Sequence, residues 1–244
     1  MTNNDTIISD DMKDFLRQHF DIDQSQYHIA EESIMMTDET RVVKVYNTDN
    51  ISFNLEDYDY QIIEDISIKL SHIIPEYVPK IYVTHKLPNE LAIIMEKLDG
   101  QPLYKYMNNK DNDYNPNDIL TMVTSIVNAF NALNNACYIH GNVNAKHIMV
   151  DKNFSVKLID FTHSDVVTAV DPADFITPKI IQDSLMLSDI IAQLIFIKKP
   201  SGSVYEVIKS IENFTVDDII GDKETATKLY NLLNVYRSSW IYND

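Results

Sequence analysis

The sequence predicts an α+β fold in which short strands come first and helices dominate later. Short runs rich in β-branched residues occupy much of the chain before residue 100, and apolar residues at helical spacing occupy much of it after residue 115. A β-hairpin pattern at residues 147–159, with a turn at residues 151–153, interrupts the helices. Hydrophobic residues make up 45% of the 244 residues, which is enough for a packed core.

The first hundred residues begin with a helix and continue mainly with strands. Residues 11–20 place apolar side chains on one side of a helix. Short strands are expected at residues 27–30, 33–36, 41–46, 78–83 and 91–95, and a second helix at residues 55–73. In the third of these strands, alternation places Val43 and Val45 on one face and Lys44 on the other.

The remainder of the chain is expected to be mostly helical. Pro116 opens a long apolar helix that extends to about residue 136, with Asn115 as its cap. The elements expected after the hairpin are a loop with Pro172 and Pro178 and helices at residues 182–197, 205–211 and 224–240.

The chain is strongly acidic, with a formal net charge of −17. Proteins bind nucleic acid by neutralising its phosphates with Lys and Arg, so nucleic acid is not an expected partner. Anionic membrane surfaces are disfavoured for the same electrostatic reason. The longest apolar run, at residues 190–197, is interrupted by Gln193 and is too short to span a bilayer. We therefore expect no nucleic-acid or membrane partner, and a charge that serves solubility.

Cys137 is the only cysteine, so no intrachain disulfide can form. Because the N-terminus is also polar and acidic, unlike a secretory signal, we expect a cytoplasmic or other intracellular location. Frequent Asn, Ile, Asp and Lys are typical of AT-rich genomes, and in a virus or an intracellular pathogen this location would be the host cytoplasm. Cys137 ends an apolar helical pattern and is expected to be a small core residue.

Residues 138–162 carry the most informative pattern. A polar loop that starts at His140 precedes the predicted hairpin, and Asp160-Phe161 follows it. This order resembles the catalytic core of the protein-kinase-like superfamily, where a loop H-x-D-x-x-x-x-N leads into a hairpin that ends in D-F-G. The resemblance implies a bilobal fold. Residues 1–97 would form a leading helix and a small antiparallel sheet with one main helix, and residues 98–244 a compact, mostly helical lobe.

The resemblance also implies nucleotide-binding residues. Lys44 matches the strand lysine that reaches the phosphates of ATP. Residues 93–100 match the hinge between the lobes, where the backbone at Glu96 and Leu98 would bind adenine. Glu64 is the nearest candidate for the helix glutamate that pairs with this lysine, but it lies one position off the apolar stripe and is expected to be solvated.

Two further residues would have structural roles if the resemblance holds. His140 would pack beneath the turn at Asp160-Phe161. Asp183 would hold the backbone of the catalytic loop, although helix capping is a simpler explanation for this residue. Gly141 after His140 resembles the H-G-D loops of compact atypical kinases and small-molecule phosphotransferases.

Three positions in the motif region depart from the family pattern. Asn142 stands where the family has the Asp that takes the proton of the attacking hydroxyl, and an amide cannot take that proton. His147 stands where the family has a metal-binding Asn, and imidazole is a poor ligand for Mg²⁺, although Asp160 could still bind one Mg²⁺. Thr162 replaces the glycine after Asp160-Phe161 and would stiffen the turn.

A fourth departure concerns ATP. The family covers the phosphates with a glycine-rich loop, but no glycine occurs between residues 1 and 99. Glu31 and Glu32 stand where that loop should begin, and two carboxylates would repel a triphosphate. We therefore expect weak or no ATP binding. No cofactor is required by the sequence, and ATP with Mg²⁺ is the candidate that the resemblance offers.

Three functional hypotheses remain open from the sequence. The first is a pseudokinase that binds a protein partner as a regulatory scaffold and transfers no phosphate efficiently. The second is an active atypical protein Ser/Thr kinase or small-molecule phosphotransferase that uses ATP and Mg²⁺. The third is an unrelated α+β domain whose loop mimics the motif by chance. The four departures favour the first hypothesis.

Overall fold

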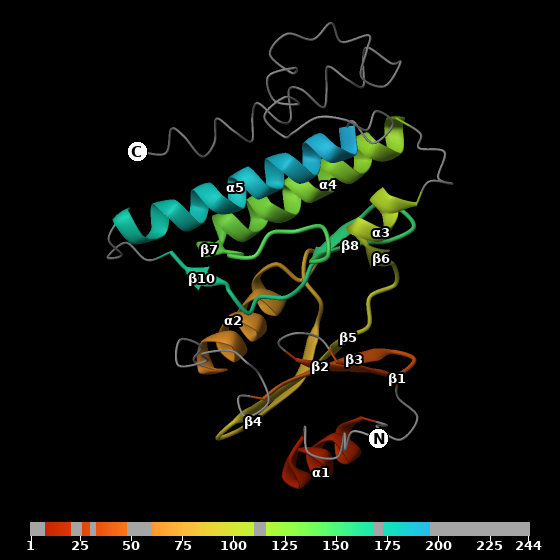
Figure 1. Ribbon diagram of the computed structural model, residues 1–244, viewed down its shortest axis with the longest axis vertical. Helices are drawn as coiled ribbons and strands as arrows, with labels where there is room; N and C mark the ends of the chain where they lie inside the picture. The colour runs from red at the N-terminus through yellow and green to blue at the C-terminus, as the bar shows by residue number, and fades with distance from the viewer. Residues whose placement is uncertain are drawn as a thin grey trace, which may run out of the picture. The chain divides into compact units, whose positions relative to one another are not determined.

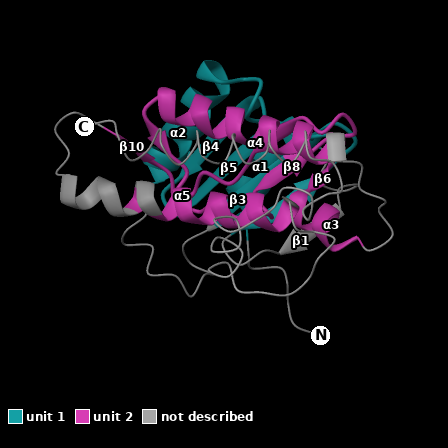
Figure 2. Cartoon of the chain, turned by 90° about the horizontal axis from the view of Figure 1, so that it is seen from above, with its two compact units in different colours: residues 1–98 teal, residues 99–244 magenta. Residues whose placement is uncertain are grey.

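The computed structural model describes residues 8–20, 26–29, 33–47, 60–109, 116–167 and 173–195. Several expected features lie outside these residues, namely the helices at 205–211 and 224–240, the helix start at 55–59, the cap Asn115 and the acidic pair Glu31-Glu32. Contacts divide the chain into two compact units, residues 1–98 and 99–244, which Figure 2 shows in different colours.

The described strands of unit 1 form a five-stranded antiparallel sheet in the order β1-β2-β3-β5-β4 (Figure 1). They are β1 (Gln26–Ile29), β2 (Ile34–Thr37), β3 (Arg41–Asn47), β4 (Ile81–Leu87) and β5 (Glu90–Glu96). These bounds confirm the predicted strands except at β4, which was expected at residues 78–83. Val78 is buried but lies in the bend before β4. A single buried apolar residue can lie in a bend as well as in a strand, which is why the strand was predicted too early.

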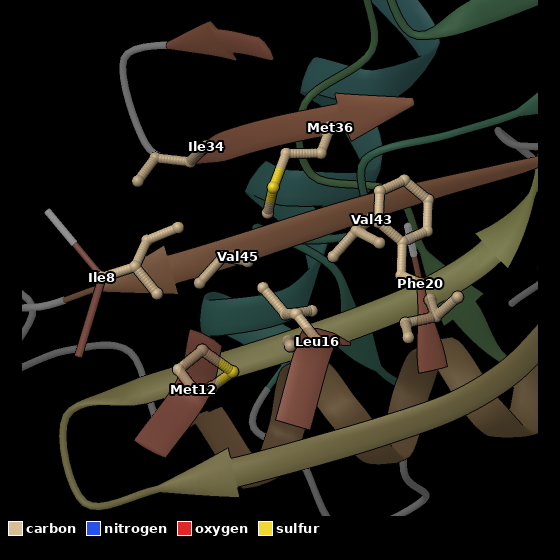
Figure 3. Close-up of a cluster of buried hydrophobic side chains, with 10 residues drawn as sticks. Ile8, Met12, Leu16, Phe20, Ile34, Met36, Val43 and Val45 are labelled. Carbon is tan, nitrogen blue, oxygen red and sulfur yellow. The ribbon is translucent and has the colours of Figure 1, made fainter. Parts of the chain in front are cut away.

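Helix α1 (Asp10–His19) covers one face of this sheet (Figure 3). The side chain of its N-cap Ser9 accepts a hydrogen bond from the Met12 backbone at 3.2 Å, and the Ser9 N–H donates to the carboxylate of buried Glu90 at 2.9 Å. The buried cluster between helix and sheet comprises Ile8, Met12, Leu16, Phe20, Ile34, Met36, Val43, Val45, Ala92 and Ile94. The sequence pattern predicts this helix but not its position on the sheet.

Helix α2 (Tyr60–Ile73) packs on the opposite face of the sheet. Alternation along β3 and β5 turns Tyr46 and Ile93 away from α1, and both join a second buried cluster with residues of α2. The members of this cluster are Tyr46, Tyr60, Ile63, Leu91 and Ile93. Ile73 continues the predicted apolar stripe but is 54% exposed, and the neighbouring Ile74 is buried instead.

The described part of unit 2 combines helices with two small sheets (Figure 1). The helices are α3 (Leu103–Asn108), α4 (Pro116–Asn135) and α5 (Ala173–Ile195). The strands are β6 (Gln101–Pro102), β7 (Tyr138–Ile139), β8 (Ile148–Val150), β9 (Val156–Leu158) and β10 (Asp165–Val166). β6, β8 and β9 form one sheet, β7 pairs with β10 in the other, and α4 lies beside α5. These elements confirm the predicted hairpin, the long helix and the α+β class.

Two expectations in unit 2 are wrong. The helix expected at residues 182–197 already begins at Ala173, so Pro178 lies inside α5. A proline removes one backbone hydrogen bond, and the helix continues past it into the buried residues Asp183 and Leu187. Cys137 is exposed rather than in the core, and it has a φ of 64° just after the end of α4. It is a turn residue that reverses the chain between α4 and β7.

No helix in the described ranges has the length and apolar character needed to cross a lipid bilayer.

Candidate functional site

The β8–β9 hairpin brings the loop after His140 next to the turn at Asp160. At the tip of the hairpin, Asp151 Oδ1 accepts two backbone N–H groups of the turn, at 2.8 and 2.9 Å. At the open end, the Ile159 N–H donates to the His147 carbonyl at 2.9 Å. The residues before β8 and after β9 are therefore neighbours in space, and the two motifs that the sequence separates meet here.

His140 is buried beneath this site, with 1% of its surface exposed. Its Nε2 lies 3.1 Å from the Ile159 carbonyl, and its Nδ1 accepts the Asn142 N–H at 3.3 Å. This pairing defines a neutral imidazole with its proton on Nε2. The ring centre lies 5.2 Å from that of Phe161. Burial, with nearby His147 as the second cause, lowers the pKa of His140 from 6.5 to about 4.

The buried side chain of Asp183 holds the backbone at the start of this loop. The His140 N–H donates to Asp183 Oδ2 at 2.9 Å, and the Gly141 N–H lies 3.1 and 3.0 Å from the two carboxylate oxygens. Asp183 lies in the middle of α5, so the alternative of helix capping is wrong. Burial raises the pKa of Asp183 to about 6, although both N–H groups and Lys179 act in the opposite direction.

Gly141 occupies a position that only glycine fits. Its φ is +75°, and a Cβ atom built there would lie 2.1 Å from the carbonyl oxygen of His163. The neighbouring His140 carbonyl accepts a hydrogen bond from the buried hydroxyl of Ser164 at 2.9 Å. The close approach of Gly141 to the His163 carbonyl and the Ser164 hydrogen bond therefore fasten this part of the loop to the segment after Asp160.

Among the described residues, the half-buried Asn142 forms hydrogen bonds only with neighbours in its own loop. Its Oδ1 accepts a hydrogen bond from Asn144 Nδ2 at 3.3 Å, and its carbonyl oxygen lies 2.9 Å from His147 Nδ1. Asn144 Oδ1 accepts the Lys146 N–H at 2.8 Å, which fixes the orientation of the Asn144 amide. Residues 140–147 contain no Asp or Glu, so this loop supplies no carboxylate to take a proton.

Asp160 lies opposite His147, at the end of the hairpin. Its φ is 68°, a conformation that Asp tolerates better than most residues. Its Oδ1 accepts a hydrogen bond from Thr162 Oγ1 at 2.6 Å, and its Oδ2 lies 3.3 Å from His147 Nε2. The side chains of His147 and Asp160 are only 16% and 19% exposed, respectively.

In unit 1, Lys44 lies on the face of β3 opposite Val43 and Val45, as alternation predicts. Its Nζ lies 4.8 Å from the centre of the Tyr46 ring. Glu64 on α2 is half-buried and accepts a hydrogen bond from the Thr84 hydroxyl of β4, so the expectation that it is solvated is wrong.

The segment predicted as a hinge begins within β5 and continues past its end. The Glu96 N–H donates to the Lys80 carbonyl at 2.8 Å, and the Lys97 N–H donates to the Thr40 carbonyl at 3.0 Å. Glu96 Oε2 also accepts the Lys80 N–H at 3.0 Å. Leu98 is the last residue of unit 1. The roles of Lys44, Glu96 and Leu98 in nucleotide binding stay predictions.

The sequence matches the family model described as protein tyrosine and serine/threonine kinase over residues 29–174, more than half of the chain. The chain belongs to this kinase family. No curated protein is similar enough to count as a match. The matched range runs from the end of β1 into α5 and includes Lys44, His140 and Asp160. The kinase-like fold implied by the sequence motifs is therefore confirmed.

The residues present do not fit the magnesium site of the kinase family. That site uses the loop Asn and the D-F-G Asp, both through oxygen. Here the first position is His147, and both oxygens of Asp160 face hydrogen-bond donors of the protein. Among the described residues, no group of three or more His, Cys, Asp or Glu side chains is arranged to hold a metal ion.

Sequence reasoning missed two residues that shape this kinase-like site. Asn144 contacts both Asn142 and His147, and Ser164 binds the His140 carbonyl. The role of Asn144 could have been predicted, because Asn commonly forms an Asx turn in which its side chain accepts the N–H two residues later, here that of Lys146. The contact of Ser164 is not visible, because 24 residues separate it from His140.

Proposed function

We propose that this protein is a pseudokinase, a kinase-family scaffold that binds a protein partner and does not transfer phosphate efficiently. The observation that carries this proposal is Asn142 at the position of the general base. Its side chain is a neutral amide that accepts a hydrogen bond from Asn144, and no carboxylate occurs from residue 140 to residue 147. Loss of a general base typically lowers a rate by a factor of about 10²–10⁴.

The well-held backbone around this position supports a role for the scaffold itself. Asp183 and Gly141 keep the loop in a defined conformation although the loop lacks the proton acceptor. The H-G start of this loop supports a compact, atypical member of the family. The single cysteine supports an intracellular location, where partner binding would take place.

The alternative is an active, atypical phosphotransferase that uses ATP and Mg²⁺. It is favoured by the retention of Lys44 and Asp160, the two residues that would contact phosphates and metal. Under this alternative, Asn142 would orient the attacking hydroxyl through its carbonyl oxygen without taking its proton.

The pseudokinase and the active phosphotransferase are distinguished by measuring phosphate incorporation from γ-labelled ATP into the protein itself and into generic protein substrates. For a pseudokinase that lacks its general base, we expect wild-type protein to stay at the background set by Asp160→Asn, and any phosphate transfer to appear only in the Asn142→Asp variant. Asn135→Asp, on the exposed end of α4, adds the same charge away from the site and serves as the matched control. Turnover by the wild type that Asp160→Asn abolishes would refute the proposal, whereas a rise of about 10²-fold or more that occurs only in Asn142→Asp would identify the missing carboxylate as the cause of the lost activity.

A further inference from the structure

The three positions at which the motif departs from the kinase pattern converge on one side chain. Asn142, His147 and Thr162 belong to two segments, 140–147 and 160–164, that the hairpin brings together. Thr162 and His147 contact Asp160 directly, and Asn142 contacts His147. The side chains of Thr162 and His147 therefore contact the Asp that the kinase pattern retains, and position 142 contacts His147 through its backbone carbonyl.

The contacts of Thr162 and His147 use both carboxylate oxygens of Asp160. The hydroxyl of Thr162 donates to Oδ1 at 2.6 Å, a short bond typical of a charged acceptor. His147 Nε2 lies 3.3 Å from Oδ2. Thr162 is buried, and the side chains of Asp160 and His147 are mostly shielded from solvent, so water competes weakly for these bonds.

The other nitrogen of His147 fixes the direction of the ring. Nδ1 lies 2.9 Å from the Asn142 carbonyl oxygen and 2.9 Å from Asn144 Nδ2. Nδ1 lies within hydrogen-bond distance of both atoms, and toward the Asn144 amide it acts as an acceptor of a hydrogen bond. Because the bond to Lys146 orients the Asn144 amide, its Nδ2 donates to His147 Nδ1, and the proton of the neutral ring then lies on Nε2, 3.3 Å from Asp160 Oδ2. The ring thus presents a donor where a metal site would need a ligand.

We propose that Asp160 has exchanged its metal ion for an internal hydrogen-bonded network, the Asp160 network, made of Asn142, His147, Asp160 and Thr162. The network joins the loop at residues 140–147 to the segment at residues 160–164 in place of a divalent cation. Any ligand that this part of unit 2 takes is consequently bound without a divalent metal. The inference rests on the proposed loss of catalysis, but it is tested by metal binding and not by phosphate transfer.

The physical reason is competition for the same oxygens. A cation at Asp160 would have to displace the Thr162 hydroxyl and the His147 N–H, which would then lie near a positive charge without an acceptor. Mg²⁺ and Mn²⁺ prefer oxygen ligands, and the network offers them no second carboxylate. Replacing both donors by groups that leave the carboxylate open should therefore restore a metal site.

The test measures Mn²⁺ binding to the full chain by electron paramagnetic resonance and calorimetry. We expect no saturable binding at Asp160 in the wild type. The double variant His147→Asn/Thr162→Val, which supplies an amide oxygen and removes the hydroxyl at nearly constant volume, should gain at least about tenfold in affinity. Adding Asp160→Asn should remove that gain. His72→Asn, on the exposed face of α2, is the control for loss of a histidine elsewhere.

Thermal unfolding gives a second readout that does not require metal. Asp160→Asn should lower the melting temperature of the wild type by about 5 °C or more, because it breaks a shielded, charge-assisted network. The same change should have a clearly smaller effect in the double-variant background, since contacting residues are not additive. Thr162→Ser, which keeps the hydroxyl, should retain most of the wild-type stability, whereas Thr162→Val should not.

Either of two results overturns the inference. One is saturable Mn²⁺ binding by the wild type that Asp160→Asn abolishes, and the other is a folded double variant with no gain in affinity. Phosphate incorporation measured on the same samples distinguishes the failures. Metal binding without phosphate transfer refutes the Asp160 network and leaves the pseudokinase proposal standing, whereas phosphate transfer refutes the pseudokinase.

Discussion

Residues 140–141 and residues 142–147 belong to one loop but are held in different ways. The first pair is fixed by Asp183, whose bonds span 43 and 42 residues of sequence. In the second group, Asn142, Asn144 and His147 bond to one another over two to five positions, and the carbonyls of Ala145 and His147 also accept the N–H groups of Tyr104 and Ile159. His140 is buried, whereas Asn142, Asn144 and His147 are half-buried.

This difference explains how the loop can keep its shape and lose its chemistry. The contacts that position the backbone come from α5 and from the segment after Asp160, and they do not involve the side chain of Asn142. A change at position 142 therefore removes a proton acceptor without removing the support of the loop. The comparison leads to three expectations, from the largest effect to the smallest.

The largest effect is expected for Gly141→Ala. Its Cβ would meet the His163 carbonyl at 2.1 Å in a conformation with φ of +75°. Strain and overlap together should lower the free energy of unfolding by about 3 kcal/mol or more. Asn142→Ala, the next residue, loses only one long hydrogen bond and should cost less than about 1 kcal/mol. Chemical denaturation of both variants measures the contrast, and similar losses would mean that the two parts of the loop are not held differently.

An intermediate effect is expected from pH. The pKa of His140 is about 4 in the folded protein and 6.5 in the unfolded chain. Its contribution to the free energy of unfolding is therefore present above pH 6.5 and lost as the pH falls toward 4. The pKa of Asp183 is about 6 in the folded protein and 3.8 in the unfolded chain. Its contribution to the free energy of unfolding is therefore present below pH 3.8 and lost as the pH rises through 6. The two contributions oppose each other between about pH 4 and pH 6, and each amounts to about 3 kcal/mol over its own window.

Asp183→Asn removes the pH-dependent contribution of Asp183 and leaves that of His140. Its deficit in unfolding free energy relative to the wild type should therefore grow as the pH falls from 6.5 to 4, by up to about 3 kcal/mol. Denaturant titrations of both proteins at several pH values measure this change. A deficit that stays constant with pH would show that Asp183 titrates no differently in the folded protein and in the unfolded chain.

The smallest effect is expected at Cys137, an exposed residue where the chain also has positive φ. Its φ is 64°, and its N–H donates to the Asn134 carbonyl at the end of α4. Cys137→Gly should stabilise the protein by about 0.5–1 kcal/mol, since glycine adopts this conformation without steric cost. Ala132→Gly, inside α4, should destabilise it by about 1 kcal/mol. If both variants changed the free energy of unfolding in the same direction, the backbone conformation at position 137 would not explain the effect.

Much of the fold can be predicted from sequence because its signals are local. The alternation of Val43, Lys44 and Val45 defines a strand and its faces, and both are found in β3. The errors occur where tertiary contacts override local signals. Pro178 lies inside a helix that continues past it, and the apolar pattern before Cys137 does not bury that residue. Helix α1 is visible as an amphipathic segment, but its place against Val43 and Val45 is not.

The positions of Asn142, His147 and Asp160 in their motifs follow from the order of residues alone, as do the strands and helices that carry them, because periodicity and spacing relate neighbours along the chain. Only the folded structure places Thr162 and His147 on the two oxygens of Asp160, and Asp183 under the backbone of Gly141. Contacts of this kind depend on how the hairpin closes and how α5 packs, and those properties arise from residues far apart in the chain.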